Sequence, residues 1–96
     1  MEIEKRLSGE EIILKPSGRI DTLTAPDLEA TMIEATIEAA NMCLDFVNVD
    51  YISSAGLRVL LSQKKKMSGN FRLINVNSSV MEILEMTGFT TIITIQ

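Results

Sequence analysis

The sequence lacks histidine and tryptophan, and Cys43 is its only cysteine. A disulfide within the chain is therefore excluded, and so is a zinc site built from cysteine and histidine ligands. Serine or cysteine nucleophiles activated by histidine are excluded for the same reason. We therefore expect no metal, no cofactor and no enzymatic activity. A lone thiol without a targeting signal is typical of a cytoplasmic protein.

Positive charge and long apolar runs are also scarce. Nine Lys and Arg residues stand against 13 Asp and Glu, and the net charge of −4 disfavours direct binding to nucleic acid. No apolar stretch approaches the ~18 residues of a membrane span, and the charged N-terminus shows no signal-peptide pattern. Apolar residues make up 46% of the 96 residues, which is typical of one globular domain over residues 1–96.

Two hydrophobic periods alternate along the chain and predict an α/β fold. Strands are expected at residues 2–7, 11–15, 42–49, 71–76 and 91–95, residues 16–21 form an edge strand or a loop, and helices are expected at 25–40, 54–67 and from 77 onward. Repeated strand–helix–strand units imply right-handed crossovers. We expect a mixed, mostly parallel sheet of four to five strands, with three or more helices mainly on one face.

Local signals mark three helix ends. Thr24 is expected to cap the helix at 25–40, and Ser79 with Glu82 forms a candidate capping box. Gly88 followed by Phe89 resembles a glycine C-cap with its apolar contact.

The helix at 25–40 carries apolar residues on two opposite sides. One side holds Leu28, Met32, Ala35 and Ala39, and the other holds Ile33, Ile37 and Ala40. The second side is either buried at the helix end or a stripe that contacts a partner.

The segment Val49–Leu57 has a composition that differs from that of purely structural segments. A buried strand ends, Ser53 and Ser54 follow, and Ala55 and Gly56 precede a leucine-rich helix. Ligands of open α/β sheets bind at the carboxyl ends of strands. A serine here can cap the helix, and it can also carry a phosphoryl group that a helix N-terminus accommodates. The small residues would let another protein approach, although Gly56 could equally serve close helix–sheet packing.

Residues 51–60, Tyr-Ile-Ser-Ser-Ala-Gly-Leu-Arg-Val-Leu, resemble the signature of STAS domains, specifically the bacterial anti-sigma factor antagonists. Three further pieces are similar to that family in order and spacing, so the resemblance covers essentially the whole chain. They are the Gly18-Arg19-Ile20-Asp21 loop followed by Thr24-Ala25, the Leu44-Asp45-Phe46 strand, and Met86-Thr87-Gly88-Phe89 at the close of the last helix.

The resemblance implies a phosphorylation-controlled binding switch that regulates transcription. In that family the unphosphorylated antagonist binds an anti-sigma factor that is also a serine kinase, and the sigma factor is released. The kinase then phosphorylates the antagonist and breaks the complex, and a serine phosphatase resets it. The family's acceptor lies two residues before the glycine and maps to Ser54, and its loop acid maps to Asp21. Ser53 stands where many members have Asp, and it is a second acceptor, a neutral cap or a sign that phosphorylation has been lost.

The expected partner-binding residues are Asp21, Thr22, Ser53, Ser54, Ala55, Gly56 and Arg58. Arg58 is either a solvated charge or a contact to the partner or the phosphate, and Asp50 is either a loop cap or part of the contact rim. We expect the free protein to be a monomer. An alternative from the same resemblance is a STAS binding subunit of a lipid-transport ABC system or of a stress-signalling assembly, in which the serine serves packing or docking without phosphate.

Overall fold

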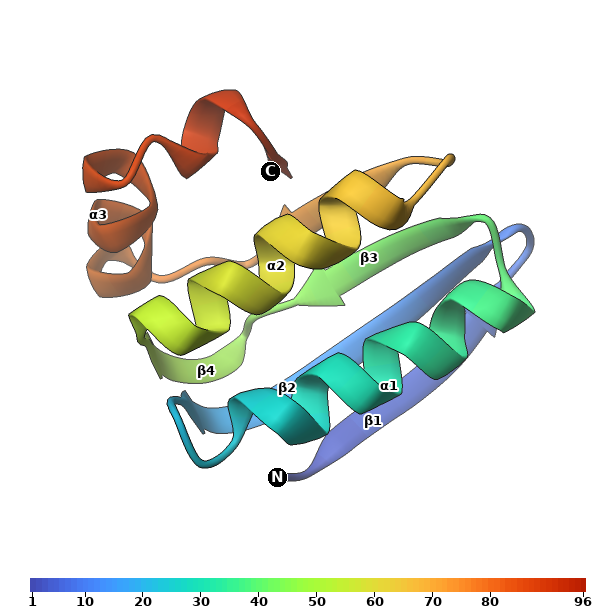
Figure 1. The fold of residues 1–96 in the computed structure, drawn as a ribbon, viewed down its shortest axis with the longest axis horizontal. Coiled ribbons are helices and arrows are strands. Elements are labelled where there is room, and N and C mark those ends of the chain that lie inside the picture. The colour runs from blue at the N-terminus through green and yellow to red at the C-terminus, as the bar shows by residue number, and fades with distance from the viewer.

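The sheet is organised around one long strand, β2 (Glu11–Ile20), in the computed structural model, which describes residues 1–96. β1 (Ile3–Ser8) pairs antiparallel with β2, and β3 (Asn41–Asp45) and β4 (Asn48–Ile52) pair parallel with its first and second halves. β5 (Phe71–Ile74) and β6 (Thr94–Ile95) continue the sheet beyond β3 in the order β1-β2-β3-β5-β6 (Figure 1).

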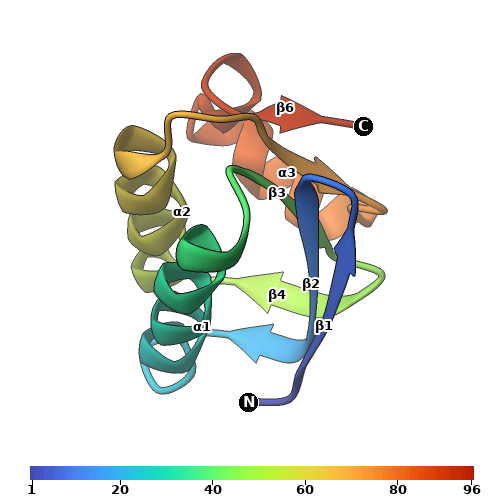
Figure 2. The ribbon, with the colours of Figure 1, turned by 90° about the vertical axis from the view of Figure 1, so that its right-hand side faces the viewer.

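The helices are α1 (Ala25–Glu38), α2 (Ser54–Lys66) and α3 (Ser78–Met86), and the short 3-10 helix η1 (Phe89–Thr91) follows. Figure 2 shows α1 and α2 side by side on one face of the sheet, and α3 packs against β4. The opposite face of β1, β2 and β3 carries no helix. The predicted α/β class with a mixed, mostly parallel sheet is therefore confirmed, and the sheet has six strands rather than four to five. None of the helices is long and apolar enough to cross a bilayer.

The additional strand arises because the expected strand at 42–49 is two strands. The Asp45 carboxylate accepts a hydrogen bond from the Val47 N–H at 3.1 Å, and the Val49 N–H donates to the Phe46 carbonyl at 3.0 Å. These bonds close a tight turn of the kind that Asp side chains favour. The turn separates β3 from β4, and the length of β2 lets both lie along its edge.

Two of the expected helix caps are wrong. Thr24 occupies the N-cap of α1, but its hydroxyl donates to the Arg19 carbonyl at 2.6 Å and makes no cap bond. The N-cap of α3 is Asn77, whose side chain accepts from the Val80 N–H at 2.8 Å, so the Ser79 capping box does not form. The glycine C-cap is confirmed, since Gly88 has a φ of 79° and Phe89 is buried.

One apolar core fills the space between the sheet and the helices. Alternate residues of β2, Ile12 and Leu14, face Leu28 and Met32 of α1 in this core, and all four are essentially inaccessible to solvent. Cys43 is also fully buried, but it does not belong to the core cluster because it alternates onto the face without helices. Burial raises the pKa of its thiol, so it is a packing residue rather than a reactive one.

Candidate functional site

The carboxyl ends of β2 and β4 bring the two candidate segments together. Ile20 and Ile52 are register partners in these parallel strands, and the Ser53 N–H donates to the Ile20 carbonyl at 2.8 Å. The loop that begins at Asp21 therefore lies beside the turn that carries Ser53 and Ser54. This is the strand edge at which ligands of open α/β sheets bind.

The two serines differ in the solvent exposure of their hydroxyl groups. Ser53 is the N-cap of α2, and its hydroxyl oxygen is buried with no hydrogen-bond partner. Ser54 is the first residue of α2 and is exposed. Only the Ser54 hydroxyl is therefore presented to solvent and to an incoming protein.

The N-terminus of α2 is electrostatically suited to an anion. The Leu57 N–H donates to the Ser53 carbonyl at 2.9 Å, whereas the N–H groups of Ser54, Ala55 and Gly56 have no helical acceptor. No acidic residue occupies the first turn, and Lys64–Lys66 lie in the last. The partial positive charge of the helix dipole at Ser54 is thus not neutralised by the chain itself.

Asp21 organises the neighbouring loop and gives it a negative charge. Its carboxylate accepts hydrogen bonds from the N–H groups of Thr24 at 3.1 Å and Leu23 at 3.0 Å. The Thr24 N–H bond is the main reason that the pKa of Asp21 lies below its usual value. Arg19, whose Nε lies 3.8 Å from the carboxylate, lowers the pKa of Asp21 by less. The Arg19 guanidinium also lies 4.4 Å from the centre of the Tyr51 ring.

Gly56 serves helix–sheet packing. A Cβ atom at this position would lie 2.6 Å from Cγ2 of Ile20 and 2.7 Å from Cγ1 of Ile52. Only glycine therefore allows α2 to approach β2 and β4 this closely. Gly56 is buried, so its part in partner binding stays a prediction that rests on its small size rather than on exposed atoms.

A shallow groove of about 330 Å³ runs between the first turns of α1 and α2. Thr22, from the loop before α1, lines one wall, and Ala55 and Arg58 line the other. Arg58 is exposed and forms no ion pair with the chain. The structure thus brings Thr22, Ala55 and Arg58 to one groove, and Ala55 directly follows Ser54 in α2.

One apolar residue at this surface was not expected from the sequence. Leu23 is 86% exposed in the loop that Asp21 organises, next to the groove. The only signal in the sequence is an isolated leucine between Asp21 and Thr24. Ile33 and Ile37 on α1 are also exposed, so the second apolar side of this helix is not buried.

Asp50 was expected to be either a loop cap or part of the contact rim. It lies in β4, is exposed and makes no hydrogen bond through its side chain. It is therefore not a loop cap.

The STAS domain family model matches residues 2–96. The chain belongs to the STAS domain family. BtrV of Bordetella bronchiseptica, which carries the name of a putative anti-sigma factor antagonist, is 34% identical over 79 residues, or 78% of this chain and 68% of BtrV. The anti-sigma-B factor antagonist of Bacillus subtilis is 25% identical over 97% of this chain and 88% of its own.

The fold of this STAS domain is also similar to that of solved antagonists. The structure of the Bacillus cell fate determinant SpoIIAA in its phosphorylated form superposes with a TM-score of 0.74 at 13% identity. The match covers 99% of this chain and 91% of SpoIIAA. No group of three or more metal-ligating side chains is placed to hold an ion in this STAS domain.

Proposed function

We propose that this STAS domain is an anti-sigma factor antagonist whose binding is switched off by phosphorylation of Ser54. Its unphosphorylated form binds an anti-sigma factor that is a serine kinase, and the sigma factor is released to act in transcription. The observation that carries the proposal is the exposed Ser54 hydroxyl at the N-terminus of α2. The names of the two curated relatives support the partner class.

The partner surface would combine apolar and polar contacts around the serine that the kinase phosphorylates. Leu23 is exposed in the neighbouring loop, and the small residue Ala55 follows Ser54 in α2 and leaves room for another backbone. Thr22 and Arg58 offer polar contacts on the two walls of the groove between α1 and α2. Ser53 is a poor acceptor in this arrangement, because its hydroxyl is buried.

Phosphorylation would act through charge and not through refolding. A phosphoserine adds about −1.5 to −2 charges at neutral pH, and the free N–H groups of α2 can accommodate them within the domain. At the interface the new charge would be buried together with that of Asp21 in the neighbouring loop, so it would need a cation from the partner or would repel the partner's acidic groups. An uncompensated like-charge contact costs several kcal/mol in a complex, and each ~1.4 kcal/mol weakens binding about tenfold.

A binding experiment with charge variants tests the proposal. Ser54→Asp should weaken binding of the cognate anti-sigma factor by at least about tenfold, whereas the uncharged Ser54→Asn should have a much smaller effect. Ser78→Asp is a matched control, because Ser78 is the exposed first residue of α3 and lies outside the proposed surface.

Isothermal titration calorimetry with each purified variant gives the affinities. Equal affinity of wild type and Ser54→Asp would contradict the proposal, and so would a loss that Ser78→Asp reproduces. Recovery of a transporter ATPase in place of an anti-sigma factor in a pull-down would also contradict it.

A further inference from the structure

The edge of β1 is open. β1 stands at the end of the strand order and pairs only with β2, and five of its six residues are exposed. An open edge presents backbone N–H and C=O groups that another strand can pair with. No residue of β1 lines the groove between the first turns of α1 and α2, so a role for this edge is independent of the proposed function.

The pairing with β2 determines which backbone groups of β1 are free. The Ser17 N–H donates to the Glu2 carbonyl at 3.0 Å, and Ile3 lies opposite Pro16, which has no N–H. Hydrogen-bonded and non-hydrogen-bonded pairs alternate along an antiparallel ladder. The even-numbered residues of β1 therefore bond to β2, and the backbone groups of the odd-numbered residues, Ile3, Lys5 and Leu7, point to the open edge.

We propose that two copies of this chain pair through this edge, β1 against β1, in an antiparallel register centred on Lys5. A twofold axis at Lys5 places Ile3 opposite Leu7 of the other copy and Glu4 opposite Arg6. The free backbone groups of Ile3, Lys5 and Leu7 are then all used, because each hydrogen-bonded pair exchanges two bonds. The sheet continues from one copy into the other.

Hydrogen bonding selects this register over its neighbours, because each of the three registers places one like-charged pair on the axis. A register centred on Glu4 would place Leu7 opposite Met1, and one centred on Arg6 would place Ile3 opposite Gly9, both outside β1. The register centred on Lys5 pairs all three odd-numbered residues within β1, and it also pairs Glu4 with Arg6 on both sides of the axis. Opposite charges at facing positions stabilise a strand pair and like charges destabilise it. Arg6 has no ion pair within its own chain, so it is free to form this one.

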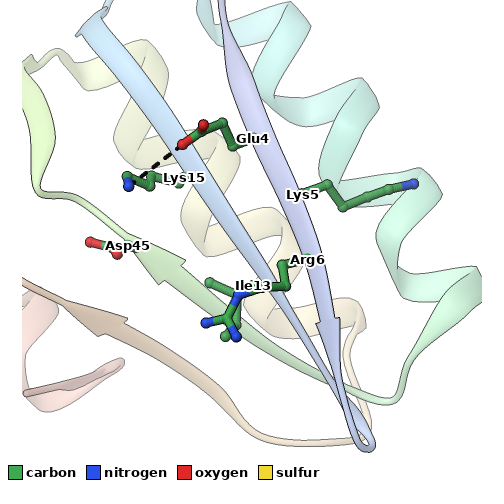
Figure 3. A pocket seen from close by; sticks show the side chains of 6 residues that line it. All are labelled: Glu4, Lys5, Arg6, Ile13, Lys15 and Asp45. Atoms are coloured by element: carbon green, nitrogen blue, oxygen red, sulfur yellow. Dashed lines mark ion pairs between the residues drawn. The ribbon is translucent and has the colours of Figure 1, made fainter.

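Side chains alternate across the strand in a way that suits the pairing. Figure 3 shows Glu4 and Arg6 on the face without helices, around a pocket of about 300 Å³, and Lys5 on the side of α1. On that same helix-covered side Leu7 is 59% exposed and would contact Ile3 of the other copy.

The two Lys5 side chains would meet at the axis, and a lysine on an edge strand usually discourages pairing. Here the Lys5 ammonium donates to Glu38 of α1 at 2.8 Å. This bond is the main reason that the pKa of Lys5 lies above its usual value. Each copy therefore brings a carboxylate with its ammonium, and the axis would hold two cations and two anions.

Sedimentation equilibrium up to about 1 mM protein tests the pairing. The apparent mass of the wild type should rise with concentration toward twice that of the chain, which leaves the expected monomer dominant when dilute. Arg6→Glu replaces two attractive pairs by repulsive ones and should weaken association by about tenfold. Adding Glu4→Arg to Arg6→Glu restores opposite charges and should restore association. A wild type that stays monomeric, or a double variant as weak as the single one, would overturn the proposal.

A disulfide test fixes the register. Cα atoms of facing hydrogen-bonded residues lie about 5.5 Å apart, within the range of a disulfide, so Lys5→Cys should form a covalent dimer under mild oxidation. Ser8→Cys is the matched control on the same exposed strand, because its two copies would lie ~20 Å apart. Cys43 is buried and common to both variants. Equal cross-linking of the two variants would overturn the register.

Discussion

The N-cap of α2 leads to a prediction that runs against the usual effect of capping residues. Replacement of an N-cap serine by alanine ordinarily costs about 0.5–2 kcal/mol, because the hydroxyl accepts a bond from the first helical turn. Ser53 makes no such bond, and its hydroxyl oxygen is buried without any partner. A buried polar group that lacks a partner costs about 1–3 kcal/mol.

Ser53→Ala should therefore raise the free energy of unfolding by about 1 kcal/mol. For a domain of this size, that corresponds to a rise in Tm of about 4–8 °C. Asn77→Ala at the N-cap of α3 is the matched comparison, since the Asn77 side chain accepts from the Val80 N–H at 2.8 Å. This variant should lose about 1 kcal/mol.

Urea unfolding followed by far-UV circular dichroism measures both variants with one protocol. The slope of free energy against urea should stay constant, so that the midpoints report stability alone. The two variants should shift the midpoint in opposite directions. A loss of stability in Ser53→Ala as large as that in Asn77→Ala would refute the reasoning, because it would show that the Ser53 hydroxyl has a partner in solution.

Three other contacts lead to predictions of their own. Gly56→Ala should lower the unfolding free energy by about 1–3 kcal/mol in urea titrations, because its Cβ would meet isoleucine side chains of β2 and β4; an unchanged midpoint would contradict the packing role. The hydrogen-bonded ion pair with Arg72 lowers the pKa of Glu11 below its usual value of 4.5. Glu11→Gln should therefore lower the unfolding free energy at pH 7, and by progressively less as the pH falls below about 4.5. A loss of stability that grows in acid would contradict this. Leu23→Ser should weaken anti-sigma factor binding in calorimetry without shifting the thermal midpoint, since its side chain is 86% exposed; unchanged affinity would exclude Leu23 from the interface.

Helix positions were predictable from the sequence because their apolar spacing is regular. The helices expected at 25–40 and 54–67 end within two residues of α1 and α2. The break between β3 and β4 was not predictable in this way, because Asp45 and Phe46 read as part of one apolar strand. The turn depends on the Asp45 side chain and on the length of β2, and the second of these is a tertiary property.

The position of the candidate site was predictable from the sequence. Which of its hydroxyl groups is exposed was not, because this depends on the fold. The motif located Ser53 and Ser54 at the start of a helix, yet the burial of one hydroxyl and the exposure of the other depend on packing against β2. Likewise, Gln63 is 1% exposed immediately before three lysines, because the helix turns this position toward the core. The amino-acid sequence around Gln63 does not indicate that this side chain is buried.

We propose Ser54 as the single acceptor that controls partner binding. The assignment is tested by incubating wild type, Ser53→Ala and Ser54→Ala with the cognate anti-sigma factor kinase and ATP, mapping the phosphate by mass spectrometry and measuring how much complex remains. We expect one phosphate on Ser54 in wild type and Ser53→Ala, with loss of the complex. Ser54→Ala should remain unmodified and bound. Phosphate on Ser53 alone, or a complex that survives modification of Ser54, would contradict the assignment.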